Sequence, residues 1–417
     1  MTIAIDNGFT KSVKAIGKQA GVDLRVATYP GVISTHERNT IAGNIEANLV
    51  DQIVRQLTAA DSAGDSVADD AEPDCRDIAF TGTFEAVNEY FQRQQWSDGL
   101  PIVPPTQARV LRMLEGTTRR RDAVVAALAP GFANATVENI AINAVMAGCE
   151  PAYLPVLIAA VEACADQAFN LQAIQATTNP VAIWIILNGP LAKTLEVNAT
   201  FNCIGEGAWA NATIGRALRL VLRNVGGALP GEMDRATQGQ PGKYTFCCAE
   251  NEDDSPWEAL HVERGFAKSV STVTVVGAEG TMNMNSHSKD AAELVHVFAQ
   301  TMIHPPSNEY THGGEPWLMI GPEHADILQR GGIDKAELKR RLWEASKMRA
   351  GLMSGRDLQR VLDSRTDELG PITHDTLLPI STKPEEICIM VAGGPGTHSV
   401  YIPCFGNSFA ATREITP

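Results

Sequence analysis

A continuous apolar run of strand length, residues 181–187, constrains the fold of this chain more than any other segment. An uninterrupted apolar strand is typical of a sheet that is covered on both faces, because neither side then contacts water. The run ends at Asn188, Gly189 and Pro190, and the glycine and proline predict a turn at this point. We therefore expect a central strand inside a layered structure.

Strand-like and helix-like patterns alternate through the second half of the chain. This alternation predicts an α/β fold with a mixed sheet and covering helices, preceded by a helix-rich segment from about residue 84 to residue 166. No internal repeat is evident in the sequence. The expected strands lie at 244–249, 270–276, 317–320 and 387–392, and the expected helices at 210–225, 289–302, 322–330 and 334–346.

An acidic stretch, residues 61–77, divides the chain into two parts of unequal size. Its aspartates and glutamate stand among alanine, serine and glycine without a hydrophobic period, which predicts an acidic linker or long surface loop. Residues 1–60 then form a small N-terminal α/β unit, with a strand at 23–29 and a helix at 45–57. Residues 78–417 form the main α/β body, which can be divided again near residue 180.

Composition and charge narrow the partners of the protein. The formal net charge of -15 argues against nucleic acid, which is bound by clustered basic residues. The apolar runs are far shorter than the roughly 20 residues of a membrane span, and the first residues lack the pattern of a signal peptide. We expect a cytoplasmic, homo-oligomeric protein that binds a small-molecule substrate and no membrane.

The residues from 243 to 287 gather more reactive side chains than any other part of the chain. Residues two apart on a strand face the same side, so His261 would point with Glu263, and Glu250 with Glu252. An imidazole beside a carboxylate suits acid–base catalysis, and His261 with Glu263 is the preferred pair. A polar network at a domain junction is the structural alternative.

The same segment also suggests a metal site. Asn283, Asn285 and His287 would share one strand face, and His261, Glu263 and His287 could together hold a divalent metal such as zinc. Two imidazoles and one carboxylate would leave coordination positions open for water and substrate.

Cys247 and Cys248 stand apart among the eight cysteines of the chain, none of which has the C-x-x-C spacing. In a reducing compartment we expect the thiols to be free. Neighbouring residues on a strand face opposite sides, so at most one of the two can enter a site. A nucleophilic thiolate would need a nearby cation, which His261 could supply. Two buried structural thiols or a vicinal disulfide are the alternatives.

Candidate substrate contacts lie on a helix and in a glycine-rich turn. The helix at 210–225 carries three arginines on one face without acidic residues three or four positions away, so an anionic ligand, a neighbouring subunit or water would be their partner. The turn at residues 393–396 could cradle an anion, but it matches neither a dinucleotide fingerprint nor a P-loop, and no nucleotide cofactor is expected. The candidate substrate-binding residues are Arg216, Arg264 (alternatively a structural ion pair), Asn283, Asn285, Gly393, Gly394 and His398.

Four of these stretches resemble segments of a bacterial family of poorly assigned function, associated with small proteins named for a selenocysteine-Gly-Ser-Cys (UGSC) motif. The resemblance extends from about Phe84 to the C-terminus and rests on residues 96–106, 211–217, 255–266 and the Gly393–Gly394 turn. It implies a thiol or selenol redox association but carries over no catalytic residues. This chain has no selenocysteine-Gly-Ser-Cys or Cys-Gly-Ser-Cys run of its own.

These patterns support three hypotheses about function. The first is an enzyme that uses a His/Glu/Cys site, with or without a metal, for hydrolysis or elimination on a small polar or anionic metabolite. The second is a thiol-based redox protein in which Cys247 or Cys248 exchanges with a thiol or selenol partner. The third is a noncatalytic scaffold subunit of a larger assembly.

Overall fold

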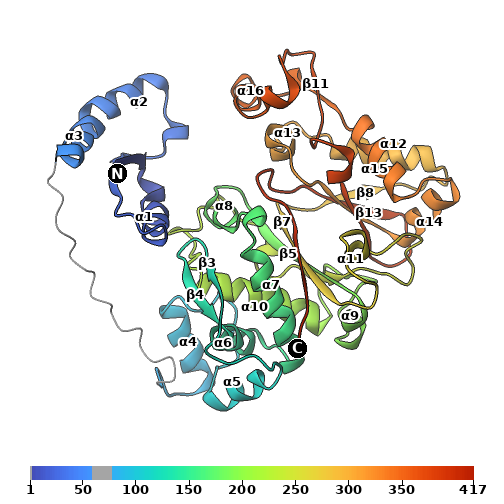
Figure 1. The fold of residues 1–417 in the computed structure, drawn as a ribbon, viewed down its shortest axis with the longest axis horizontal. Coiled ribbons are helices and arrows are strands. Elements are labelled where there is room, and N and C mark those ends of the chain that lie inside the picture. The colour runs from blue at the N-terminus through green and yellow to red at the C-terminus, as the bar shows by residue number, and fades with distance from the viewer. Residues whose placement is uncertain (1, 59–77) are drawn as a thin grey trace.

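The computed structural model describes residues 2–58 and 78–417, and the predicted acidic linker lies outside these ranges (Figure 1). The strands of the described chain are β1 (Thr2–Asp6), β2 (Arg25–Tyr29), β3 (Val124–Leu128), β4 (Ala133–Thr136), β5 (Ala182–Asn188), β6 (Cys247–Ala249), β7 (Thr272–Ala278), β8 (Met282–Asn285), β9 (Trp317–Ile320), β10 (Met348–Arg349), β11 (Leu377–Leu378), β12 (Cys388–Val391), β13 (His398–Ile402) and β14 (Ala411–Glu414).

The helices are α1 (Thr10–Gln19), α2 (Arg38–Asn44), α3 (Val50–Thr58), α4 (Phe84–Arg93), α5 (Gln107–Leu114), α6 (Val137–Ala147), α7 (Leu154–Cys164), α8 (Leu171–Ala176), α9 (Pro190–Thr194), α10 (Trp209–Asn224), α11 (Leu260–Glu263), α12 (Ala291–Met302), α13 (Asn308–His312), α14 (Pro322–Arg330), α15 (Lys335–Ala345) and α16 (Gly355–Leu369). The fold is α/β with mixed sheets and covering helices, as the sequence predicts.

Two four-stranded mixed sheets form the centre of the main body. The first has the order β14-β7-β5-β6 and the second the order β12-β9-β13-β8. In the first sheet β5 pairs parallel with β6 and antiparallel with β7. In the second sheet β9 pairs parallel with β12 and antiparallel with β13. Three strands of each sheet, β6-β5-β7 in the first and β12-β9-β13 in the second, therefore have the same arrangement.

The fourth strand of each sheet comes from the other half of the chain. β8 follows β7 but pairs antiparallel with β13, whereas β14 follows β13 but pairs antiparallel with β7. The segment after β7 and the segment after β13 are joined by an antiparallel bridge between Ala278 and Cys404. β5 and β9 also both end at a Gly-Pro pair that begins a helix, α9 and α14. The structure thus contains a topological repeat with exchanged strands, which the sequence did not reveal.

The sheets stack face to face, with helices on both outer sides. Alternate residues of β5 and β9, such as Trp184 and Trp317, meet in an inner core between the sheets. Intervening residues such as Ile185 pack outward in one core with α6, α7 and α10, and Leu318 packs outward in another with α12, α14 and α15. Figure 1 shows the strands between these two groups of helices. The continuous apolar run of β5 follows from this burial on both faces.

The segment from 84 to 166 is mostly helical, as predicted, and it also contains two strands that the sequence did not indicate. β3 and β4 form an antiparallel hairpin there, with an irregular register between Val124 and Ala126. The alanine-rich sequence of β3 favours a helix by local propensity, and pairing with β4 overrides that preference.

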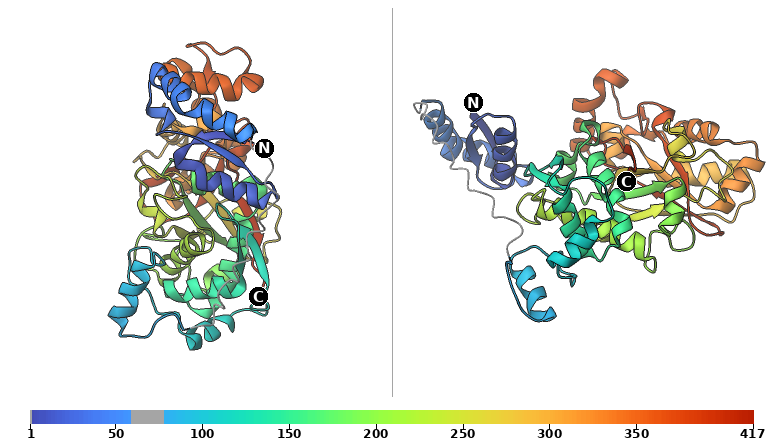
Figure 2. Two further views of the ribbon diagram at one scale, coloured as in Figure 1. Left: turned by 90° about the vertical axis from the view of Figure 1, so that its left-hand side faces the viewer. Right: turned by 60° about the horizontal axis from the view of Figure 1, so that its bottom comes forward.

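The N-terminal unit is a small α/β element, visible to one side of the main body in Figure 2. β1 and β2 pair in parallel, and the Gln52 side chain of α3 bonds the backbone of Thr28 through contacts of 3.1 and 3.0 Å. An ion pair of 2.7 Å joins Lys11 to Glu232 of the main body.

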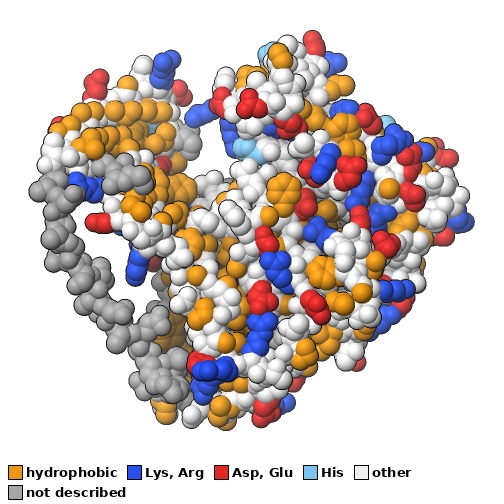
Figure 3. Space-filling model, in the orientation of Figure 1, with side chains coloured by type: hydrophobic (Ala, Val, Ile, Leu, Met, Phe, Trp, Pro, Cys, Tyr) orange, Lys and Arg blue, Asp and Glu red, His pale blue; other side chains and the backbone are white. Residues whose placement is uncertain are grey.

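On the face drawn in Figure 3, positive and negative side chains are interspersed over the main body. In the described part of the chain, no single helix is long and apolar enough to span a membrane. One pair of helical segments, Pro151–Cys164 and Gln167–Ala176, is long and apolar enough for a membrane span when taken together, but the two segments are bent by 72°.

Candidate functional site

A cluster of polar side chains lies where the parallel strands β5 and β6 end. Asn188 is the last residue of β5, Glu250 follows β6 directly, and Glu252 lies two residues further along the chain. The short helix α11 brings His261 to the same place. In open α/β sheets, the carboxyl ends of parallel strands are the usual location of ligand sites. We refer to Asn188, Glu250, Glu252 and His261 as the polar cluster.

Short hydrogen bonds hold the two carboxylates of the polar cluster. Asn188 Nδ2 donates to Glu250 Oε2 at 2.5 Å and to Glu252 Oε1 at 3.1 Å. The backbone N–H of Leu260 donates to Glu250 Oε2 at 2.7 Å, and that of Gly189 to Glu252 Oε1 at 2.7 Å. Nδ1 of His261 lies 3.8 Å from Glu252 Oε1.

Gly189 is needed for this geometry. Its φ of +83° is unfavourable for other residues, and a Cβ atom there would stand 2.4 Å from the carbonyl oxygen of Val270. The backbone can therefore turn sharply after β5 and present its N–H to Glu252.

Several buried atoms of this region have no hydrogen-bond partner among the described residues. They are Asn188 Oδ1, Glu250 Oε1, both ring nitrogens of His261, and Oγ1 of Thr272, which stands opposite Asn188 in the β5–β7 ladder. Buried polar atoms are almost always paired, since an unpaired one costs about 1–3 kcal/mol. The concentration of unpaired donors and acceptors indicates a place for a polar ligand or ordered water.

The two carboxyl groups have different environments. Burial raises the pKa of Glu250, against the opposing charge of Lys335 and the hydrogen bonds from Leu260 and Asn188. Glu250 is 5 % exposed, whereas the side chain of Glu252 is 18 % exposed and reaches solvent. Carboxyl groups in such different surroundings can take opposite roles in proton transfer.

The predicted pairing of His261 with Glu263 was wrong, because residues 260–263 form a helical turn and not a strand. The two side chains therefore do not share a face. Glu263 forms ion pairs with Lys335, at 3.0 Å, and with Lys339. Both lysines belong to α15. The local alternation of apolar and polar residues around His261 could not indicate that this helix would supply the partners of Glu263.

The predicted metal ligands His261, Glu263 and His287 do not form a ligand set. His287 is exposed just beyond β8, at the edge of the second sheet, and Glu263 is paired with two lysines. Within residues 2–58 and 78–417, no three His, Cys, Asp or Glu side chains are grouped as metal ligands. The residues present do not fit the predicted metal site.

Cys247 and Cys248 point to opposite faces of β6, as strand parity predicts. Cys247 packs outward among the helices, and Cys248 faces the inner core, on the same side of the strand as Glu250. Burial raises the pKa of both thiols. The Trp184 indole N–H donates to Cys248 Sγ at 3.4 Å.

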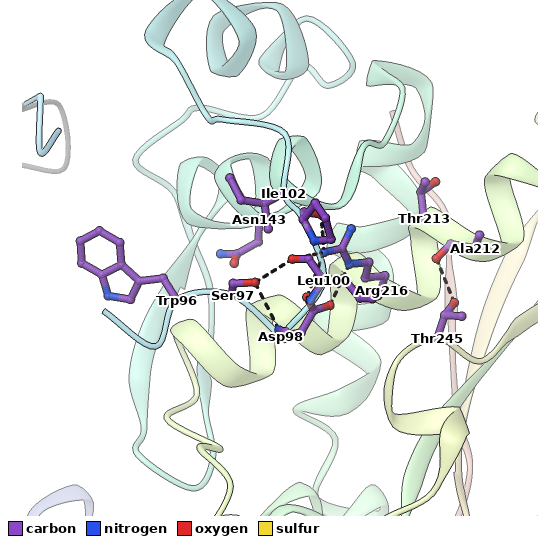
Figure 4. A network of polar contacts seen from close by, with 12 residues as sticks. Trp96, Ser97, Asp98, Leu100, Ile102, Asn143, Ala212, Thr213, Arg216 and Thr245 are labelled. Atoms are coloured by element: carbon purple, nitrogen blue, oxygen red, sulfur yellow. Dashed lines mark hydrogen bonds and ion pairs between the residues drawn. The ribbon is translucent and has the colours of Figure 1, made fainter. Parts of the chain in front are cut away.

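The arginines of α10 have partners within the chain, contrary to the prediction of a ligand, a subunit or water. Arg216 binds both carboxylate oxygens of Asp98, at 2.7 and 2.9 Å, and the carbonyl oxygen of Pro101 at 2.9 Å (Figure 4). Arg219 pairs with Asp234 at 2.7 Å, and Arg223 donates to a backbone carbonyl. The segments 96–106 and 211–217 thus contact each other.

Arg264, which follows α11, and the candidate residues of β8 and β13 have partners outside the polar cluster. Arg264 pairs with Glu315 at 3.6 Å and lies over the Trp317 ring, which supports its structural alternative. Asn283 Oδ1 and His398 Nδ1 are 3.0 Å apart at the exposed edge of the second sheet. Asn285 stands opposite His398 in the same ladder.

The Gly393–Gly394 turn lies beside the polar cluster. Asn251, between the two clustered glutamates, donates its N–H to the carbonyl oxygen of Val391 at 2.8 Å. The N–H of Gly393 donates to Ala199 O at 2.8 Å, and the Phe201 ring packs against Gly394, where a Cβ atom would come within 2.2 Å. The turn therefore borders the site without contacting its unpaired atoms.

No protein-family model, curated protein or solved structure matches this chain in the three comparisons made.

Proposed function

We propose that the chain is a cytoplasmic enzyme that performs acid–base catalysis, in a hydrolysis or elimination, on a small polar metabolite at the polar cluster. The observation that carries this proposal is the set of unpaired buried atoms around Asn188, Glu250 and His261. A purely structural network would pair these atoms with one another.

Glu250 is the candidate general acid. Burial raises the pKa of this carboxyl group, and Oε2 is held by Asn188 and Leu260 while Oε1 is unpaired. When Glu250 is protonated, a carboxyl group with one oxygen fixed can present its proton through the other.

His261 and Glu252 are the candidate base. The carboxylate of Glu252 stands 3.8 Å from the imidazole and can orient it, and the other ring nitrogen has no competing partner among described residues. In an elimination, the imidazole would remove a proton from one side of the substrate and Glu250 would supply a proton to the leaving group on the other. In a hydrolysis, the imidazole would instead remove a proton from the attacking water.

The substrate class follows from the burial and polarity of the site. Asn188 and His261 are fully buried, so access is from the side of Glu252. The unpaired atoms include both acceptors and a hydroxyl, which suits a compact molecule with hydroxyl or amide groups.

The proposal is tested by incubating the purified full-length chain with a mixture of small hydroxy acids, amides and esters and following each by mass spectrometry. We expect one class to be consumed, and Glu250→Gln and His261→Asn to slow consumption by about 10²–10⁴-fold. The matched control is Glu263→Gln, which removes a nearby carboxylate outside the cluster and should retain the rate. Equal rates in all variants, or a larger loss in the control, would refute the assignment.

A further inference from the structure

A small cavity lies at the start of β5, at the opposite end of this strand from the polar cluster. It is lined by residues of α8, β5 and α10 and by the helical turn 241–243 before β6. Its volume is about 10 Å³, which is room for about one water-sized particle. The polar side chains on its wall are Gln175, Arg219 and Lys243, and the other lining residues are glycine or aliphatic. These three side chains therefore decide what the cavity can bind.

The segment that carries Lys243 is held closely against α10. Gly215 of α10 has no side chain, and a Cβ atom there would stand 2.4 Å from Oγ1 of Thr245. The Thr245 hydroxyl lies on the helix, 2.9 Å from the carbonyl oxygen of Ala212 and 3.1 Å from that of Asn211 (Figure 4). Because this contact fixes the chain two residues after Lys243, the lysine is held beside α10.

Lys243 and Arg219 share one carboxylate. Lys243 Nζ donates to both oxygens of Asp234, at 2.9 and 2.7 Å, and Arg219 Nη2 donates to Oδ2 of Asp234 at 2.7 Å. The side chains of Asp234, Arg219 and Lys243 are only 5 %, 14 % and 16 % exposed. Among residues 2–58 and 78–417, no second Asp or Glu forms an ion pair with either cation. Two largely buried positive charges thus contact a single negative charge.

The polar groups around the cavity include unused donors and no unused acceptor. Gln175 is 4 % exposed, and its Oε1 accepts from Arg219 Nη1 at 2.8 Å. Both oxygens of Asp234 already accept hydrogen bonds. In the described part of the chain, Gln175 Nε2 and Arg219 Nε donate to no acceptor, and Lys243 Nζ, with three N–H groups, bonds only Asp234. A particle in the cavity must therefore accept hydrogen bonds.

We propose that the cavity binds a monatomic anion of the size of chloride, held by Lys243, Gln175 and Arg219. Such an anion accepts from the unused N–H groups and supplies the missing negative charge, whereas water supplies no charge and a cation would be repelled. Arg219 keeps Asp234 as its partner, and the anion compensates the charge that Lys243 adds. Because a buried charge without a counterion is unfavourable, the bound anion stabilises the folded chain.

The experiment measures thermal unfolding of the purified full-length chain in sodium chloride and in sodium gluconate at equal ionic strength. Gluconate is too large for the cavity, so it controls for the screening of charges by salt. We expect a higher unfolding midpoint in chloride than in gluconate, and bromide should act as chloride does. The acid–base function of the polar cluster has no part in this measurement, so the two proposals can fail independently.

Two variants locate the effect of chloride. Gln175→Glu places a carboxylate on the cavity wall and keeps an oxygen for Arg219, and Lys243→Met removes the uncompensated charge. Both should lose the difference between chloride and gluconate. The matched control is Lys193→Met, which removes an exposed lysine paired with exposed Asp253 and should keep the full difference.

A second measurement on the unsubstituted chain keeps the proposal testable if a variant fails to fold. Crystals grown in sodium bromide should show an anomalous diffraction peak in the cavity, beside Lys243 Nζ. Equal midpoints in chloride and gluconate, a chloride effect that persists in folded Gln175→Glu, or a cavity without a bromide peak would overturn the proposal.

Discussion

Replacing Asp98 with Asn would leave the Arg216 guanidinium charged and without its counterion. The side chains of this pair are only 7 % and 14 % exposed, and the contact is bidentate, with distances of 2.7 and 2.9 Å. Removing one partner of a buried ion pair typically costs about 3–5 kcal/mol. Because the carbonyl oxygens of Leu100 and Pro101 still accept from Arg216, we expect the lower end, about 3 kcal/mol.

The assay is urea unfolding of Asp98→Asn and of the unsubstituted chain, monitored by circular dichroism. The free energies of unfolding are compared with the same dependence on urea concentration for both proteins. A second variant, Asp98→Asn with Arg216→Met, removes both charges and should recover part of the loss. A loss below about 1 kcal/mol in the single variant is typical of exposed ion pairs. It would show that the Asp98–Arg216 pair does not stabilise the contact between residues 96–106 and α10 as a buried ion pair would.

Three further outcomes follow from other parts of the structure. Burial raises the pKa of Glu309 to about 8 and that of Glu279 to about 7, so the folded chain holds protons that the unfolded chain releases from pH 4.5 upward. Stability measured by thermal unfolding should then fall as pH rises from about 4.5 to 8, and Glu309→Gln should flatten that fall; an unchanged profile would contradict the raised pKa. Gly189→Ala should destabilise the fold by at least about 1 kcal/mol, because its φ is positive and the Cβ meets the Val270 carbonyl; denaturant midpoints that match those of the unsubstituted chain would refute this. Lys335→Met should lower the stability near neutral pH more than Lys193→Met, because Lys335 is buried against Glu263 whereas Lys193 is exposed. Equal denaturant midpoints for the two variants would contradict this prediction.

The fold class and its central strand could be predicted because they depend on local patterns. The apolar run of β5 marks a strand covered on both faces, and the bounds of β9 and α14 follow from an apolar run and a Gly-Pro start. The exchange of β8 and β14 between the sheets could not be predicted, because a strand carries no local mark of which partner it pairs with. The β3–β4 hairpin was missed because the alanine-rich sequence of β3 favours a helix by local propensity.

The candidate site was predicted only in part. His261 was singled out correctly as a member of a polar group, and Glu250 and Glu252 were recognised as a pair, but the carboxylate beside His261 is Glu252 and not Glu263. Asn188 was seen only as the end of a strand. Its role arises because β5 and β6 are parallel neighbours, and the same long-range effect joins Arg216 to Asp98 across 118 residues.

The most direct test of the polar cluster is the ratio of kcat/KM between Glu250→Gln and Glu263→Gln on the metabolite that the chain consumes. The two substitutions have the same chemistry, and only the first removes a carboxyl group with an unpaired oxygen at the end of β6. We predict that Glu250→Gln is at least about 100-fold slower than Glu263→Gln. Equal values for two folded variants would contradict the assignment of the polar cluster as the catalytic site.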